Sequence, residues 1–364
     1  MLNLLQIEEE AFVPPFCPRP SCPRYRQQLA DFCTPAGRHR NNAKDLWVRR
    51  FRCRYCGHTF SSQTFRVDYW DKKPLLNAPL FDRLTQSGGL RETHRRFLGQ
   101  ISRRCLVRKG RKVLGQTQYL HGNHLGRLPE DAEFSLDELV TFEGSRITGP
   151  LTLPVLIETK SMLVIAAESA PIAPAKRSAT RRKARIEAAE ARSGKRPHRE
   201  VEVVRAVLET LKPLVEGRKR LVFHTDKKPL YGRLLREVFG AERVVHLVSS
   251  GRAGKQPLSP LFRINLTAAI LRDLEPRLRR RSWLSAKDRR YLNQSLQGHL
   301  VYRNCRRRRF NQDPPEHTPA VLAGLLQAPL TLADCVQWRQ DFGEVSIFPS
   351  CRDGTQSWKS VRAM

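Results

Sequence analysis

The stretch Arg220–Gly240 reads RLVFHTDKKPLYGRLLREVFG, and it predicts a strand, an acidic residue and a helix in that order. The apolar run Leu221–Phe223 is typical of a short buried strand, and the residues after Pro229 have the spacing of an amphipathic helix. Asp226 stands between the two. Ligands and metals bind beyond the carboxyl ends of strands in such sheets, whereas a carboxylate in mid-strand would carry a large desolvation penalty. Asp226 is therefore a candidate functional carboxylate.

A second acidic residue lies in a strand-like run earlier in the chain. The segment Phe134–Gly144 reads FSLDELVTFEG and contains Asp137. Two carboxylates on separate strands can share a divalent metal ion. We therefore expect Asp137 and Asp226 to act together.

The charge of the chain indicates an anionic partner. Its 364 residues include 66 Lys and Arg against 35 Asp and Glu, a net charge of +31, and this length is expected to form two or three units. Nucleic acid is the expected partner because neutralised phosphates release counterions; a membrane surface and ribosomal RNA are competing interpretations. No apolar run approaches the roughly 20 residues of a membrane span, and the first residues lack the pattern of a signal peptide. We expect a soluble, cytoplasmic protein.

The cysteines near the N-terminus predict a zinc ribbon over residues 1–70. The chain has nine cysteines, an odd number, which favours metal over disulfides in a reducing compartment. Two close pairs suit tetrahedral Zn²⁺, and a metal can hold together a unit too small for a large core. Cys33 and His58 are further candidate ligands, and unconnected buried cysteines are the alternative. The two pairs are Cys17 with Cys22, and Cys53 with Cys56.

Residues 71–128 are predicted to form a helix-turn-helix. Asn77 can cap a first helix, a second contains Leu90 and His94 and breaks at Gly99, and Ser102 caps a third, basic helix. In this order the last helix enters the major groove of DNA. A solvated helical linker is the alternative interpretation. The expected DNA-binding residues are Arg103, Arg104, Arg108, Lys109, Arg111 and Lys112.

Residues 129–310 are predicted to form an RNase H-like mixed sheet flanked by helices, an α/β class. Three strand-like runs between 134 and 172 form an antiparallel meander. A basic interruption near 173–199, either a loop or a helix along a phosphate backbone, separates them from a helix at 201–215. The strand at Leu221, the following helix and a strand at 243–248 complete the order. Asp137 and Asp226 fall in the first and fourth strands, where that fold gathers its acids.

These segments together resemble insertion-sequence transposases of the DDE type that carry a zinc ribbon and a helix-turn-helix before an RNase H-like domain. The resemblance rests on RCRYCGHTFSSQT, SLDELVTFEG, VFHTDKKPLYG and the late segment that begins PLFRINLTAAILRDLEPR, and it covers most of residues 15–305. It implies that Asp137 and Asp226 are catalytic acids that bind Mg²⁺ or Mn²⁺. It also implies DNA cleavage and strand transfer by a homo-oligomer bound to element ends in the bacterial nucleoid.

The third acid of that family, a Glu, has no counterpart at the usual place. The region reads Leu261–Leu266 without a carboxylate, so Asn265 is the candidate third catalytic residue, with Asp273 or Glu275 as substitutes on the same predicted helix. A neutral amide holds divalent cations less well than a carboxylate. A decayed or repurposed transposase that only binds DNA is therefore the alternative, and an RNA-processing nuclease is a third. The tail 311–364 carries no motif and is expected to cover the catalytic domain or to mediate self-association.

Overall fold

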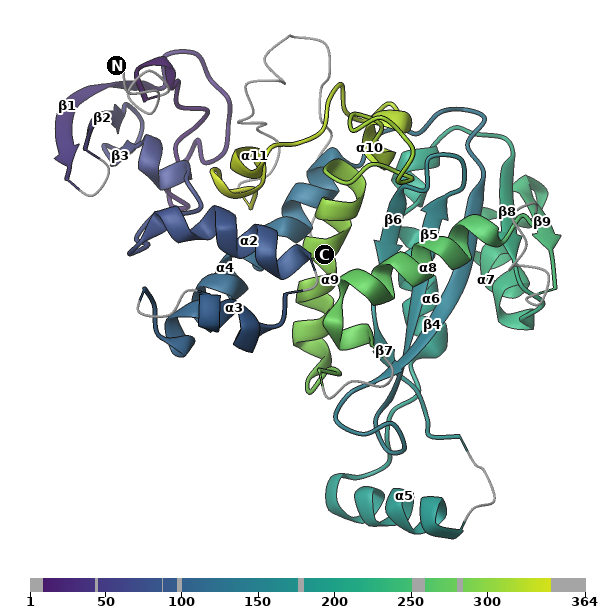
Figure 1. Ribbon diagram of the computed structural model, residues 1–364. Helices are drawn as coiled ribbons and strands as arrows, with labels where there is room; N and C mark the ends of the chain where they lie inside the picture. The colour runs from purple at the N-terminus through teal and green to yellow at the C-terminus, as the bar shows by residue number, and fades with distance from the viewer. Residues whose placement is uncertain are drawn as a thin grey trace. The chain divides into compact units, whose positions relative to one another are not determined.

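The computed structural model describes residues 9–42, 45–86, 88–96, 100–175, 180–250, 259–279 and 284–341 (Figure 1). The chain divides into two compact units. The N-terminal unit comprises Met1–Pro79 and Leu332–Met364, and the sheet unit comprises Leu80–Thr331. The division after Pro79 falls inside the predicted helix-turn-helix region, and residues 332–341 of the predicted tail belong to the N-terminal unit; residues 342–364 lie outside the described part of the chain.

The N-terminal unit is built on a three-stranded antiparallel sheet with aromatic packing. Its strands are β1 (Cys33–Asn41), β2 (Leu46–Cys53) and β3 (Thr59–Ser61). Phenylalanines 12, 16, 51, 60 and 65 are buried together with the cysteines. Trp338, which follows α11 (Leu332–Val336), stacks on Phe12 at 5.6 Å between ring centroids. The late segment 332–341 therefore adds a side chain to the small core of the N-terminal unit.

The sheet unit contains a mixed sheet with the strand order β6-β5-β4-β8-β9, and β7 pairs with β5. Strands β4, β5 and β6 are antiparallel, whereas β4 with β8 and β8 with β9 are parallel. The predicted meander and the predicted later strands are therefore confirmed. The bounds are β4 (Phe134–Phe142), β5 (Pro150–Glu158), β6 (Val164–Ala167), β7 (Ala170–Pro171), β8 (Leu221–Thr225) and β9 (Val244–Val248).

Helices cover both faces of this sheet (Figure 1). On one face, Val155 and Leu139 are buried with Ile264 and Leu271 of α8 and with residues of α9. On the other face, α6 contacts β5 and packs against α7. The class predicted from the sequence, α/β with a mixed sheet between helices, is confirmed. The bounds are α6 (Glu200–Glu209), α7 (Pro229–Phe239), α8 (Phe262–Leu274) and α9 (Arg289–Cys305), with the short α10 (Pro319–Leu322) after them.

Three helices precede the sheet in the chain: α2 (Asn77–Thr85), α3 (Leu90–Arg96) and α4 (Arg103–His124). The side chain of Ser102 accepts a hydrogen bond from the backbone N–H of Cys105, which confirms the predicted cap of α4. Helix α4 packs along α9, and a Cβ atom on Gly298 of α9 would lie 2.5 Å from Leu114 Cδ2. A larger residue at this crossing would therefore require the Leu114 side chain to move. The predicted turn residues Ser87 and Gly99 lie outside the described residues.

The basic interruption forms a helix, α5 (Thr180–Ser193), which stands away from the sheet (Figure 1). None of its described residues is buried. Its base is held by Arg196, which donates to Glu143 Oε1 at 2.8 Å and to the carbonyl of Pro150 at 3.2 Å. Glu143 also accepts from the backbone N–H of Arg289 at 2.8 Å. Residues 176–179 lie outside the described part.

Candidate functional site

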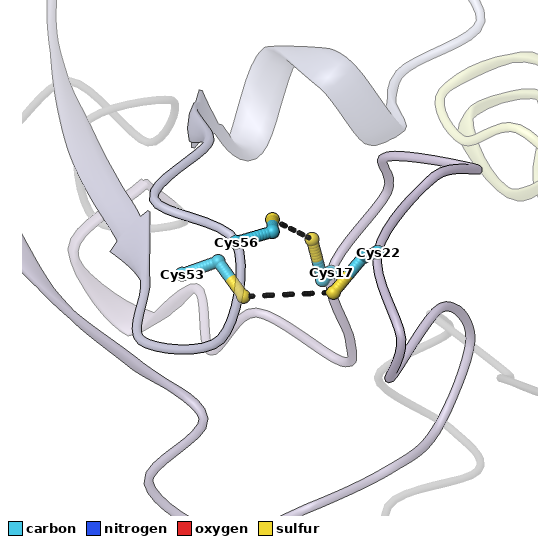
Figure 2. Close-up of side chains that lie close together, drawn as sticks. All are labelled: Cys17, Cys22, Cys53 and Cys56. Atoms are coloured by element: carbon cyan, nitrogen blue, oxygen red, sulfur yellow. Dashed lines mark hydrogen bonds between the residues drawn. The ribbon is translucent and has the colours of Figure 1, made fainter.

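The four predicted zinc ligands come together in the N-terminal unit (Figure 2). Cys53 ends β2, and Cys56 follows it in a tight turn in which the backbone N–H of Gly57 donates to the carbonyl of Cys53 at 3.0 Å. Gly57 has a φ of +67°, which a glycine adopts without strain. Cys17 and Cys22 approach from the preceding loop. Two segments far apart in the sequence therefore supply two thiols each.

The geometry of these thiols fits a tetrahedral metal ion. The sulfur atoms all lie within 4.8 Å of one another, with 3.6 Å between Cys17 and Cys56 and 3.9 Å between Cys22 and Cys53. Zn–S bonds of about 2.3 Å in a tetrahedron place the sulfur atoms about 3.8 Å apart. Burial raises the pKa of the Cys17 and Cys22 thiols and thus disfavours their thiolate forms. A bound metal cation would stabilise these thiolates. The cluster can bind a metal ion such as zinc.

The other candidate ligands of this unit are not part of the cluster. Cys33 pairs with Cys53 across β1 and β2, and its thiol pKa is raised by burial. His58 stacks on Phe60 at 6.4 Å between ring centroids. None of the described cysteines forms a disulfide.

The two predicted catalytic aspartates lie on neighbouring parallel strands of the sheet unit. Asp137 is in β4, and Asp226 follows Thr225, the last residue of β8. Leu136 pairs with Thr225, so the next residues, Asp137 and Asp226, stand at the same level of the sheet. Asp137 pairs with Val155, whose side chain packs under α8, and this places Asp137 on the α8 face. The backbone N–H of Lys228 donates to Asp226 Oδ1 at 3.0 Å.

The electrostatics of Asp137 show that the two carboxylates act on each other. The pKa of Asp137 is raised, first by burial and further by the negative charges of Asp226 and Glu138. A hydrogen bond from the backbone N–H of Glu138 and the positive charge of Arg272 on α8 oppose this increase. A carboxylate that is partly desolvated and repelled by a second one is stabilised by a cation. This pair can therefore hold a cation, although it offers only two carboxylates.

Within the described residues, the cysteines form the only cluster of three or more close candidate metal ligands. The other two acids of the segment Phe134–Gly144, Glu138 and Glu143, bind other groups. Glu138 points to the α7 face, where its carboxylate accepts from Thr152 and from Lys228 Nζ at 2.6 Å. Lys228 also pairs with Glu200 at 3.0 Å, and these acids raise the lysine pKa although burial alone would lower it. Glu143 accepts a hydrogen bond from Arg196, which follows α5.

Helix α8 carries the candidate third positions. Asn265 and Arg272 are seven residues apart, so they share a stripe of the helix and are separated by about 10 Å along its axis. Arg272 is the α8 residue whose charge acts on Asp137. Helix α8 thus brings a cation to Asp137.

Glu275, a predicted substitute for the third acid, is fully buried in the core and binds other protein groups. Its carboxylate lies 2.8 Å from His299 Nε2 and 3.2 Å from Arg277 Nη1, and it accepts from Ser295 at 2.5 Å. Burial would raise its pKa, but His299 and Arg277 lower it to about 2. The prediction that Glu275 reaches the metal site is therefore wrong. The sequence does not predict this buried interaction, because His299 and Ser295 lie in α9, about 20 residues further along the chain.

The six predicted DNA-binding residues of α4 do not form one surface. Lys109 is buried and only 3% exposed, so its assignment to DNA is wrong: it lies on the face of α4 that carries Leu106 and Val113. Arg111 lies over the ring of Tyr291 at 4.5 Å and donates to its hydroxyl. Arg104, Arg108 and Lys112 recur every four residues and form an exposed stripe, and Arg103 is also exposed.

His224, two residues before Asp226, has a structural partner. Its Nε2 lies 2.8 Å from Glu133 Oε2, and the ring is mostly buried. His224, which is close to Asp226 in the sequence, thus forms a pair with Glu133.

Comparison with the patterns of known protein families finds no family that matches this chain, and comparison with characterised proteins finds no matching relative. Among the described residues, no helix is long and apolar enough to cross a membrane.

Proposed function

We propose that this protein is a DNA transposase that cleaves and transfers DNA strands in a metal-dependent reaction. The observation that carries the proposal is the placement of Asp137 and Asp226 at the same level of neighbouring parallel strands, where their charges interact. Paired carboxylates are a common means of holding Mg²⁺ or Mn²⁺ for phosphoryl transfer.

The strand order supports an RNase H-like catalytic domain. Three antiparallel strands followed by two parallel ones, with helices on both faces, match the arrangement expected for that fold. Asp137 belongs to the first strand of this order and Asp226 follows the fourth. This placement supports Asp137 and Asp226 as the metal ligands of the proposed fold.

The residues of the chain have distinct roles in this proposal. Asp137 and Asp226 hold the divalent ion, which when bound supplies charge stabilisation for the displaced oxygen and activates the attacking water or 3′-hydroxyl. Lys228 positions Asp226 through its backbone N–H, and its side chain keeps Glu138 on the opposite face of the sheet. Arg272 is placed to neutralise part of the negative charge on Asp137.

DNA is the proposed partner because the chain carries a net charge of +31. The exposed stripe of Arg104, Arg108 and Lys112 on α4 is the proposed contact with duplex phosphates, and α2, α3 and α4 are proposed to act as the helix-turn-helix. The joining of two DNA ends implies at least two copies of the chain on the DNA. The metal-bound cysteine cluster is proposed to stabilise the N-terminal unit.

A second candidate function is DNA binding without cleavage. Two observations favour it: the acid pair has no third carboxylate beside it among the described residues, and a cation, Arg272, acts on Asp137 instead. A cationic side chain near two carboxylates can replace a metal ion as their counter-charge. In this case the protein would bind DNA through α4 on an inactive scaffold.

Nicking of supercoiled plasmid DNA distinguishes the two candidates. The zinc-loaded wild type is compared with Asp226→Asn, Asn265→Ala and the control Glu209→Gln, in Mg²⁺ and in Mn²⁺. If the protein is a transposase, the wild type and Glu209→Gln nick the DNA. The nicking rate of Asp226→Asn is then lower by at least about a hundredfold, the usual effect of losing one catalytic group. Tight DNA binding without nicking by the wild type in either metal would identify the second function. Loss in Asn265→Ala would identify Asn265 as a third ligand.

A further inference from the structure

The sheet unit contains a groove of about 600 Å³ that is separate from the acid pair. Its apolar floor is formed by Leu90 of α3, Val107 and Leu114 of α4, and Leu284 before α9. Leu284 and Tyr291, which also lines the groove, are each 38% exposed. Pockets of about 300–1,000 Å³ with an apolar lining and a few polar groups bind ligands of drug or nucleotide size. The groove is thus large enough for a planar ligand.

The rim of the groove is strongly basic. Six basic residues line it against two acidic ones, Glu92 and Asp288. Both acids already bind cations of the chain: Glu92 lies 3.2 Å from Arg96, and Asp288 lies 2.6 Å from Arg290. Two of the rim cations are also paired, Arg95 with Glu92 at 3.7 Å and Arg277 with the buried Glu275 at 3.2 Å. The remaining rim cations, among them Arg103 and Lys287, still give the rim an excess of positive charge that attracts an anion. The basic residues are Arg91, Arg95, Arg103, Arg111, Arg277 and Lys287.

The types of these residues favour a ligand with aromatic rings and phosphates. Five of the six cations are arginines, whose planar guanidinium group both binds phosphate through two hydrogen bonds and stacks on aromatic rings. The guanidinium of Arg111 is already fixed over the ring of Tyr291, at 4.5 Å from its centroid, and donates to the hydroxyl. Both residues line the groove beside its apolar residues. Bases of nucleic acids stack on aromatic side chains.

Duplex DNA does not satisfy this groove, because its bases are paired inside the helix. Only its phosphates could meet the rim, and the apolar floor with Leu284 would stay exposed to water. An unpaired strand can insert a base over the floor and place the neighbouring phosphates against the arginines. The groove is therefore complementary to a single strand in both its apolar and its charged part.

We propose that this groove, between α3, α4 and α9, binds an unpaired segment of a nucleic-acid strand. A base stacks beside Tyr291 and Arg111 on the apolar floor, and Arg103 and Lys287 contact phosphates. The site extends the proposed function, in which DNA strands are separated and joined, and it rests on DNA being the partner. It does not depend on the aspartates or on strand cleavage, so it is tested without divalent cations.

Fluorescence anisotropy with the zinc-loaded full-length protein tests the site. The probes are a fluorescein-labelled oligodeoxythymidylate and a fluorescein-labelled hairpin duplex of the same length, with no Mg²⁺ or Mn²⁺ added. Tyr291→Ala is expected to weaken binding of the single strand about tenfold, the usual effect of removing one stacking aromatic side chain, and to change duplex binding less than about twofold. Tyr291→Phe keeps the ring and is expected to retain single-strand binding.

Tyr119→Ala is the matched control, because Tyr119 is 37% exposed on α4 and does not line the groove. It is expected to leave binding of both probes unchanged. Equal weakening of both probes by Tyr291→Ala, or no weakening of the single strand, would overturn the proposal. Displacement of the oligonucleotide by polyglutamate at equal charge concentration would also overturn it, since the groove would then select acidic chains without regard to bases. Absence of nicking in the plasmid assay bears only on the proposed function.

Discussion

The cysteine cluster and the aspartate pair are two candidate metal sites that differ in completeness. The cluster brings four thiols within 4.8 Å of one another, and three of the four cysteines are buried. The pair offers two carboxylates, one of them partly desolvated, and a nearby arginine. A closed set of four ligands is typical of a structural zinc site, whereas an open set leaves positions for water or substrate. The cysteine cluster is therefore suited to a structural metal ion, whereas under the proposed function the aspartate pair would bind an exchangeable one.

The position of the ligands in the chain explains this difference. Cys53 is the last residue of β2, the other three cysteines lie outside strands and helices, and each pair is close in sequence and placed by local turns. The aspartates depend on the register of β4 with β8, and a third ligand would have to come from α8. The sheet unit is stabilised by its own apolar core, so it can stay folded when one of these metal-binding positions is lost. The predictions below test whether the two sites differ in this way.

Cys53→Ser is expected to have the largest effect. It removes one ligand of the complete site, and structural zinc contributes apparent binding free energies of about 10–16 kcal/mol to the folding of small metal-bound units. We expect loss of bound zinc, measured by mass spectrometry, and rapid proteolysis of the N-terminal unit, with the sheet unit retained. Cys33→Ser, outside the cluster, is the control and keeps both zinc and protease resistance. A zinc-free Cys53→Ser protein with an intact N-terminal unit would show that this metal is dispensable.

Glu275→Gln is expected to lower the free energy of unfolding of the sheet unit by about 3–5 kcal/mol, because breaking a buried ion pair leaves its partners uncompensated. The folded pKa of Glu275 is about 2, below its ordinary value of 4.5. Its stabilisation is therefore fully present above pH 4.5 and is lost as the pH falls towards 2. Urea denaturation at several pH values measures this. The exposed Glu209→Gln is the control, and a small effect of Glu275→Gln would return Glu275 to the list of possible metal ligands.

Asp226→Asn is expected to stabilise the metal-free sheet unit slightly, by on the order of 1 kcal/mol, the energy of two nearby charges close to a protein surface. The raised pKa of Asp137 means that its ionised form is disfavoured in the folded protein, so stability decreases as the pH rises through the ordinary value of 3.8 and the raised folded value. Where both carboxylates are ionised, the variant removes the part of this penalty that is due to Asp226. A thermal melt without divalent cations measures it. A lower melting temperature for the variant would show that Asp226 is stabilising by itself.

The sequence predicted those parts of the fold that depend on local patterns. The alternation of β4 and the apolar runs of β5 and β8 predicted the strands, and the paired spacing of the cysteines predicted their cluster. The burial of Lys109 was not predictable, because it depends on which face of α4 packs on α9. The pairing of Glu275 with His299 and the stacking of Trp338 on Phe12 join segments far apart in the chain. Such contacts follow from tertiary packing, which local patterns do not encode.

The most direct test of the acid pair is equilibrium binding of Mn²⁺, followed by electron paramagnetic resonance in zinc-loaded protein. The wild type is compared with the double variant Asp137→Asn Asp226→Asn and with Glu209→Gln. We predict that the wild type and Glu209→Gln bind Mn²⁺ at least about tenfold more tightly than the double variant, because carboxylates are the ligands that this ion prefers. Equal Mn²⁺ binding by all three proteins would contradict the assignment of Asp137 and Asp226 as a metal site.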